Sequence, residues 1–218
     1  MFDCMTQAEL EAHLEISRYG TFELTDAIRP APNLTPTEGY RHDTYLDTES
    51  GNAIPVLLAA ASREKLFGLF LDLTEQMSDT VAVRLHSSHY PVALCNADNS
   101  YRESMDRTVL QSTILDFEDL LLNDGSMGMS VLHDSLCEEI QFDEHKLLII
   151  FSNRQRLFED VLKQHHIPCN QDIQLVIDAK HIHSSTDAFA EQFAQLLTRL
   201  GLDGFDSDSD NLHEDSIA

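Results

Sequence analysis

The predicted fold of this chain depends on residues 41–72, RHDTYLDTESGNAIPVLLAAASREKLFGLFLD. They align with residues 132–163, LHDSLCEEIQFDEHKLLIIFSNRQRLFEDVLK. A shift of 91 residues aligns the two stretches without a gap. Identical residues fall at both polar and apolar positions. They are His42 and His133, Asp43 and Asp134, Leu57 and Leu148, Arg63 and Arg154, Leu66 and Leu157, Phe67 and Phe158, and Leu71 and Leu162. We interpret this similarity as an internal duplication.

Each stretch carries the pattern of a hairpin followed by a helix. Residues 41–47 alternate, 48–52 form a polar turn, 54–61 are apolar, and Ser62 precedes a helical run at 63–77. A strand at 80–86, a polar loop at 89–106 and a helix at 109–122 follow, with Gly125 in the left-handed position after that helix. The second half repeats this order. Its predicted elements are strands at 129–136 and 146–152, a helix at 154–167, a strand at 173–179 and a helix at 186–200.

The predicted fold is therefore α/β (α+β), with two tandem ββαβα repeats packed as a pseudo-symmetric pair of mixed or antiparallel sheets, plus an N-terminal helix. Residues 1–39 hold that helix, with Thr6 and Glu9 in capping-box spacing, and a Pro-rich linker. The repeats occupy residues 40–125 and 126–202. Residues 203–218 carry six acidic residues and neither Lys nor Arg, which predicts a disordered acidic tail.

Composition excludes several classes of partner. The chain has 14 Lys and Arg against 38 Asp and Glu, a formal charge of −24, so nucleic acids and anionic lipid surfaces are poor partners. The longest apolar run, residues 54–61, is too short for a membrane span, and no signal-like start is present. Cys4, Cys95, Cys137 and Cys169 form no C-x-x-C pair, so we expect buried thiols in a reducing compartment and a cytoplasmic location.

The polar residues kept by both halves are the candidate site. Besides the two His-Asp pairs, a shift of 97 places residues 85–88, with His86, over residues 182–185, with His183. Two sets could then bind a transition metal such as zinc, iron or manganese: His42, Asp43 and His86, and His133, Asp134 and His183. Neighbours in a strand point to opposite faces, so each His-Asp pair would need a bulge to bind one ion. The alternative is that these side chains satisfy backbone groups at strand ends.

Motifs of common enzyme classes are missing from the sequence. It has no Gly-x-Ser-x-Gly, no Gly-x-Gly-x-x-Gly and no Walker loop. The leading expectation is a non-enzymatic interaction or regulatory protein, an adaptor or chaperone-like module, that binds a protein partner with a basic or amphipathic surface. The alternative is a metal-dependent hydrolase that uses the duplicated sets. A third reading is a small-molecule sensor with a pocket between the repeats, covered by residues 89–106.

Overall fold

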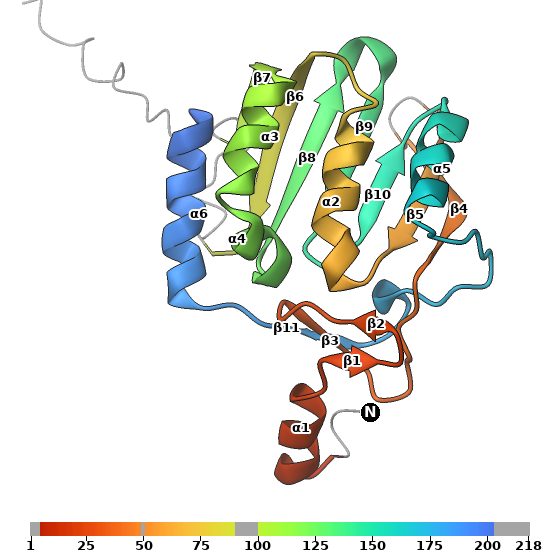
Figure 1. Cartoon of the computed structure of the whole chain (residues 1–218), viewed down its shortest axis with the longest axis vertical. Coiled ribbons are helices and arrows are strands. Elements are labelled where there is room, and N and C mark those ends of the chain that lie inside the picture. The colour runs from red at the N-terminus through yellow and green to blue at the C-terminus, as the bar shows by residue number, and fades with distance from the viewer. Residues whose placement is uncertain (1–4, 49–50, 90–99, 203–218) are drawn as a thin grey trace, which may run out of the picture.

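One seven-stranded antiparallel sheet forms the centre of the protein (Figure 1). The structure is a computed structural model, and it describes residues 5–48, 51–89 and 100–202. The strand order is β4-β5-β10-β9-β8-β6-β7. The strands are β4 (Gly39–Leu46), β5 (Ala53–Ala60), β6 (Thr80–Ser87), β7 (Tyr101–Asp106), β8 (Met127–His133), β9 (Glu138–Phe142) and β10 (Leu148–Phe151). Because β5 pairs with β10 and β6 pairs with β8, both predicted repeats contribute to the same sheet.

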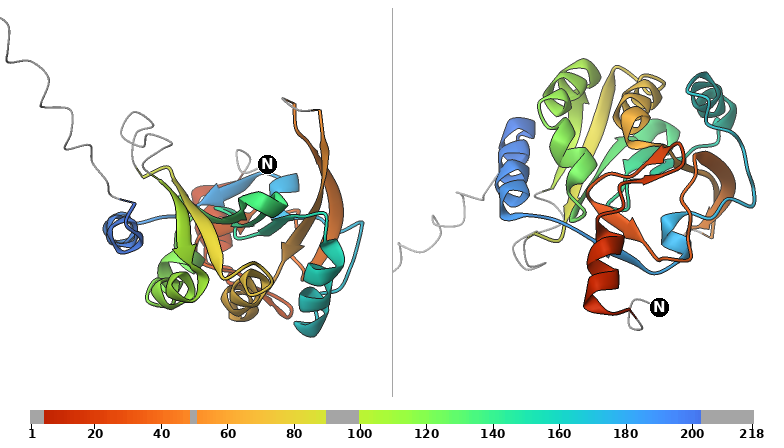
Figure 2. Two further views of the ribbon diagram at one scale, coloured as in Figure 1. Left: turned by 90° about the horizontal axis from the view of Figure 1, so that it is seen from above. Right: turned by 60° about the horizontal axis from the view of Figure 1, so that its bottom comes forward.

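Helices cover one face of this sheet, as the view from above shows (Figure 2). They are α2 (Arg63–Thr74), α3 (Arg107–Leu115), α4 (Glu118–Asn123) and α5 (Gln155–Gln164), and α6 (Asp187–Leu200) lies beside α3 and α4. Leu66 and Phe70 of α2 are buried against sheet residues such as Leu57 and Phe142, whose ring meets that of Phe70 edge-on at 5.3 Å. The amphipathic spacing seen in the sequence therefore buries the helices on the sheet.

The opposite face receives the N-terminal segment and the chain that follows α5. These parts contain α1 (Gln7–Leu14), β1 (Arg18–Tyr19), β2 (Phe22–Glu23), β3 (Ile28–Pro30), the 3-10 turn η3 (Val176–Asp178) and β11 (His181–His183). A second apolar cluster holds them to the sheet, with Phe22 and Leu175 among its buried members. β3 and β11 pair antiparallel, so the segment between α1 and the main sheet and the segment before α6 meet in one small sheet.

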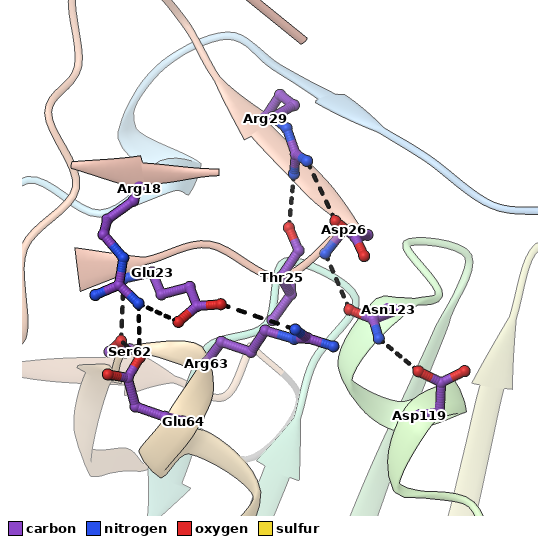
Figure 3. Close-up of polar contacts among 10 residues, drawn as sticks. All are labelled: Arg18, Glu23, Thr25, Asp26, Arg29, Ser62, Arg63, Glu64, Asp119 and Asn123. Carbon is purple, nitrogen blue, oxygen red and sulfur yellow. Dashed lines mark hydrogen bonds and ion pairs between the residues drawn. The ribbon is translucent and has the colours of Figure 1, made fainter. Parts of the chain in front are cut away.

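Polar contacts fasten the N-terminal segment to the helical layer (Figure 3). The backbone N–H of Glu23 donates to the Ser62 hydroxyl at the start of α2 (3.0 Å). The backbone N–H of Asp26 donates to the Asn123 side chain at the end of α4 (3.0 Å). Arg29 is buried and donates to the carbonyl oxygens of Leu14, Thr25 and Ile28. These contacts fix the position of β3, and through it that of β11.

The predicted duplication is not confirmed by this architecture. Two hairpin–helix units, β4-β5-α2 and β9-β10-α5, lie side by side with β5 against β10. After these units the halves differ, because β6 enters the main sheet whereas β11 leaves it to pair with β3. The structure thus has a mixed α/β fold with a large antiparallel sheet, and the tandem ββαβα repeat with its pseudo-symmetry is not confirmed.

Several local predictions also differ from the structure. The strand expected at 173–179 is instead the turn η3, because backbone bonds stay local: Asp178 N–H donates to Leu175 and Ala179 N–H to Val176. The helix expected at 109–122 divides at Asp116 into α3 and α4. The expected loop at 89–106 ends in β7, while residues 90–99 and the predicted tail lie outside the described residues. The N-terminal helix and its Thr6–Glu9 capping box are confirmed.

Within the described ranges, no helix has both the length and the apolar character that crossing a bilayer requires.

A buried carboxylate connects the first residue of β9 to the start of α5. Glu138 accepts hydrogen bonds from the Ser152 hydroxyl (2.6 Å) and from Arg154 Nε (2.8 Å). Burial acts to raise the pKa of Glu138, but these hydrogen bonds and the Arg154 charge outweigh it and hold that pKa below its ordinary value. The ionised pair therefore stabilises the fold above the ordinary carboxyl pKa, and this stabilisation is lost as the pH falls through the lowered value.

We predict that Arg154→Met lowers the free energy of unfolding by about 2 kcal/mol at pH 7, because it leaves a buried carboxylate without its charged donor. Urea unfolding at several pH values measures this effect, and the deficit should shrink as the pH falls below the ordinary carboxyl pKa and Glu138 becomes protonated. Arg156→Met, at an exposed position in the same helix, is the matched control and should change stability little. Equal losses in both variants would contradict the assignment.

Candidate metal centre

Two histidines of β11 face the same side of that strand. His181 and His183 are two residues apart, and side chains at this spacing in a strand point in one direction. Their ring centroids lie 5.0 Å apart. β11 is held against β3 with His181 opposite Pro30 and His183 opposite Ile28. The strand thus presents two imidazoles side by side.

The third histidine comes from the turn between β9 and β10. His145 follows Asp143 and Glu144 in this turn, which is closed by hydrogen bonds from Lys146 N–H to the Asp143 carbonyl (3.0 Å) and from Leu147 N–H to Asp143 Oδ1 (2.8 Å). Lys146 has a positive φ of 60°, so the chain reverses sharply here. The reversal brings His145 to 4.8 Å from His181 and 4.9 Å from His183, measured between ring centroids.

The three rings form a group that could hold a metal ion. One ligand atom from each of His145, His181 and His183 lies within 4.8 Å of the others. Nitrogen ligands of a tetrahedral zinc site lie about 3.3 Å apart, given zinc–nitrogen bonds of about 2.05 Å. The rings would therefore have to close up by about 1.5 Å on binding. His183 is exposed and the other two are half-buried, so the group remains open to solvent.

Hydrogen bonds at Nδ1 orient all three rings. Nδ1 of His145 contacts Asp143 Oδ2 (2.8 Å), that of His181 contacts the Ala179 carbonyl (2.9 Å), and that of His183 contacts the Gly125 carbonyl (2.6 Å). Each of these partners is an acceptor, so Nδ1 carries the proton of the neutral ring and Nε2 keeps its lone pair. No hydrogen bond reaches the Nε2 atoms of these three rings from any described residue. This pattern is typical of metal-binding histidines.

The group lies in a polar, acidic setting. The hydrogen bond to Asp143 is the main reason why the pKa of His145 is raised above its ordinary value. Burial lowers the pKa of the adjacent Lys146 to about 8, although Asp143, Asp124 and Glu144 oppose the shift. Lys146 Nζ donates to the Met127 carbonyl (3.0 Å), so this ammonium group is directed into the protein.

A hollow of about 310 Å³ opens beside His145. Its lining includes His86, Gln141, Asp143 and Glu144. Burial, followed by the nearby Arg84 charge, lowers the pKa of His86, and its Nε2 lies 3.2 Å from the Ser130 hydroxyl. The hollow offers space for a small molecule next to the histidines.

The first set proposed from the sequence is not brought together. His42 lies on β4 and His86 on β6, which are five strand positions apart in the sheet, or about 24 Å at the usual spacing. His42 Nε2 instead contacts Glu159 Oε1 (2.7 Å). Asp43 accepts a hydrogen bond from the next backbone N–H, that of Thr44 (2.7 Å). No bulge turns His42 and Asp43 to one face, because the β4–β5 register is regular through both residues.

The second set is likewise separated. His183 contacts Gly125, just before β8 begins at Met127, whereas His133 ends that strand six residues later, about 20 Å away. Asp134 begins the 3-10 turn η2 (Asp134–Leu136), beyond His133. Of the six residues singled out, His183 alone belongs to the three-histidine group. His145 and His181 were not predicted from the sequence to lie in a site. The alternation of His181 and His183 could have indicated two imidazoles on one face of a strand.

Comparison of the chain with protein-family models, with curated proteins and with solved structures finds no match. The case for a function therefore depends on the geometry alone.

Gly125 joins the three parts of the protein that meet at this centre. Its N–H donates to the Ser184 carbonyl (2.8 Å), its carbonyl accepts from His183, and a Cβ here would lie 2.3 Å from the Ala27 carbonyl oxygen. Gly125 is not among the residues with positive φ, so the left-handed cap expected from the sequence is wrong; Gly201 (φ 67°) has that conformation after α6. Close approach of three backbones is what requires a glycine at position 125.

We predict that Gly125→Ala lowers the free energy of unfolding by about 2 kcal/mol or more, because the new methyl group meets backbone atoms that cannot turn aside. Gly68→Ala is the matched control. A Cβ at Gly68 meets nothing within 4 Å, and this exposed site in α2 should gain about 0.5 to 1 kcal/mol from the higher helix propensity of alanine. Urea denaturation measures both. An unchanged free energy of unfolding in Gly125→Ala would show that the three backbones leave space for a methyl group.

Proposed function

We propose that this protein binds one transition-metal ion, of the kind zinc represents, through Nε2 of His145, His181 and His183. The observation that carries the proposal is the set of three Nδ1 hydrogen bonds on three neighbouring rings, which leaves the Nε2 lone pair of each ring without a hydrogen-bond partner among the described residues. A random surface cluster would leave the ring tautomers free. Neutral imidazole is the ligand form that zinc, copper, nickel and iron accept.

A three-histidine set leaves a fourth position for water or a substrate. Such an open position is a property of catalytic zinc sites, whereas structural sites use four protein ligands. A metal ion there would lower the pKa of bound water to about 7 and so supply hydroxide for hydrolysis. The hollow next to His145 would receive the substrate. Because Asp143 and Glu144 line it and the chain carries a formal charge of −24, a neutral or cationic substrate fits best. A metal-dependent hydrolase is thus the activity that we propose.

The duplication enters this proposal only in a limited form. We propose that residues 41–72 and 132–163 descend from one unit, in which β5 and α2 correspond to β10 and α5, whereas the shift of 91 places β4 over residues 130–137 and so over β8 more than β9. The metal ligands do not repeat with them: under the shifts of 91 and 97 residues, Ile54, Arg84 and His86 correspond to His145, His181 and His183. The expected stoichiometry is therefore one ion per chain.

Binding of a basic or amphipathic protein partner is the second candidate function. Tyr45 and Leu46 at the end of edge strand β4 are 51% and 60% exposed, beside a hollow lined by Ile54, Phe151 and Glu139 among others. Exposed apolar side chains next to carboxylates would suit such a partner. The cytoplasm remains the proposed location, although Cys137 and Cys169 are exposed and not buried as the sequence predicted. A folded protein that binds no metal would leave this candidate in first place.

We predict one equivalent of zinc per chain when the untagged protein is stripped with a chelator, reloaded and dialysed, as measured by elemental analysis. His145→Ala, His181→Ala and His183→Ala should each lose stoichiometric binding, since two imidazoles cannot replace three. His42→Ala and His86→Ala should retain one equivalent, because these residues lie away from the ligand group or only border the hollow. Loss of zinc from His42→Ala and His86→Ala, with retention of zinc by the three variants of the ligand group, would contradict the proposed ligand set.

A second prediction concerns the carboxylate behind His145. Asp143→Asn should weaken zinc affinity about 10- to 100-fold, because the amide carries no charge to strengthen the basicity of the ring. It also has one acceptor oxygen, where Asp143 uses one oxygen for His145 and the other for Leu147 N–H. Glu144→Gln is the matched control: it removes the same charge from an exposed neighbour in the same turn, and no described residue donates a hydrogen bond to the Glu144 side chain. Competition with a chromophoric chelator measures both affinities. Equal weakening would mean that charge alone, and not orientation, is what Asp143 contributes.

A further inference from the structure

A second group of reactive side chains lies at the outer edge of the sheet. After α5 the chain returns along edge strand β4, where Tyr40 N–H donates to the Pro168 carbonyl (2.9 Å) and Asn170 N–H donates to the Tyr40 carbonyl (2.8 Å). The Gln171 side chain then bonds both backbone groups of His42, accepting at 3.2 Å and donating at 2.7 Å. These contacts hold the exposed thiol of Cys169 beside β4.

His42 lies between this thiol and a carboxylate. Cys169 Sγ is 3.9 Å from His42 Nδ1, and His42 Nε2 is 2.7 Å from Glu159 Oε1 on α5. An ionised carboxylate only accepts hydrogen bonds, so Nε2 carries the ring proton and Nδ1 presents its lone pair to the thiol. The ring also packs edge-on against Tyr40, at 5.8 Å between centroids. A thiol, a base and a group that orients the base are thus arranged in series.

Exposure increases from the carboxylate to the thiol, as nucleophilic catalysis requires. The Glu159 side chain is 17% exposed and the His42 side chain 41%, while Cys169 is exposed. The carboxylate is therefore partly shielded, where it can stabilise a protonated imidazole, and the thiol is accessible to a reactant. The three residues come from a strand, a helix and a loop that only the fold brings together.

We propose that Cys169 is a nucleophile, that His42 is its general base and Glu159 its orienting carboxylate, and that the site accepts an acyl group from a small uncharged ester or thioester. The Sγ–carbonyl carbon bond forms as the thiol proton passes to His42 Nδ1. The bond to the leaving alcohol or thiol then breaks, and that group takes the proton back from His42. The products are S-acyl Cys169 and the free alcohol or thiol, so atoms and charge balance.

The presence of a general base, His42, indicates that the substrate is an acyl compound. An imidazole that returns its proton assists a leaving group, which alkylation of a thiol does not need. Acidic residues surround the site, with Glu159 and Asp160 both acting on nearby Tyr40, whose pKa burial raises to about 12. Anionic substrates are therefore disfavoured. This site is separate from the three-histidine group, which belongs to the β9–β10 turn and β11, and it does not depend on a metal ion.

The test uses p-nitrophenyl acetate and the full chain with Cys4 and Cys95 replaced by serine, so that Cys137 and Cys169 are the remaining thiols. We expect one equivalent of p-nitrophenolate to be released rapidly, with the acetyl group found on Cys169 by peptide mass mapping. His42→Ala should slow this acetylation about 100-fold or more, as expected for loss of a general base, and Glu159→Gln should slow it by a smaller factor. Cys137→Ser should leave the rate unchanged.

Circular dichroism of each variant separates loss of the base from loss of the fold, and Glu159→Gln keeps the size of the side chain. Acetylation of Cys169 no faster than that of Cys137 would overturn the proposal. So would a rate that survives His42→Ala in a folded protein. Because the assay is run in the presence of a chelator, its outcome is independent of whether the three-histidine group binds metal.

Discussion

The crossing of three backbones at Gly125 is the constraint on which the rest of the candidate centre depends. Here the end of the α4–β8 connection, the residue before β3 and the residue after β11 approach so closely that no side chain fits. The neighbouring Asp124 is fully buried and accepts from Ser126 N–H (2.9 Å), with His89 Nε2 at 2.6 Å on its other oxygen. The loop is therefore rigid on both sides of the glycine. That rigidity fixes the carbonyl group that orients His183.

The orientation of their rings distinguishes these three histidines from the other histidines that the structure describes. Several other imidazoles contact carboxylates through Nε2: His42 with Glu159, His89 with Asp124 and His165 with Asp72. In those pairs the carboxylate occupies Nε2 and leaves Nδ1, which at His42 lies near the Cys169 thiol. In the three-histidine group the acceptors all lie at Nδ1. Which ring nitrogen contacts the acceptor therefore determines which nitrogen of a histidine keeps its lone pair.

Hydrophobic periodicity predicted most of the elements, because strands and helices that bury one face must show it in sequence: the hairpin β4-β5, the helices α2 and α5 and the capped helix α1 all appear where expected. Pairing could not be predicted in the same way. Nothing local states that β5 lies against β10, or that β11 leaves the main sheet for β3. For this reason His183 and His181 could be noticed, but His145, supplied by a turn some 36 residues earlier, could not be joined to them. Identity between the halves pointed to His42 and His86, which the sheet holds apart.

Metal binding at this centre requires that the three Nε2 atoms are unprotonated. Long-range proton–nitrogen NMR spectra of the imidazoles, recorded on the metal-free protein at a pH where the rings are neutral, show which nitrogen carries the proton. We expect the Nδ1–H form for His145, His181 and His183, and a shift of their Nε2 signals alone when one equivalent of zinc is added. An Nε2–H form for any of the three, or zinc-dependent shifts at His42 and His86 instead, would contradict this expectation.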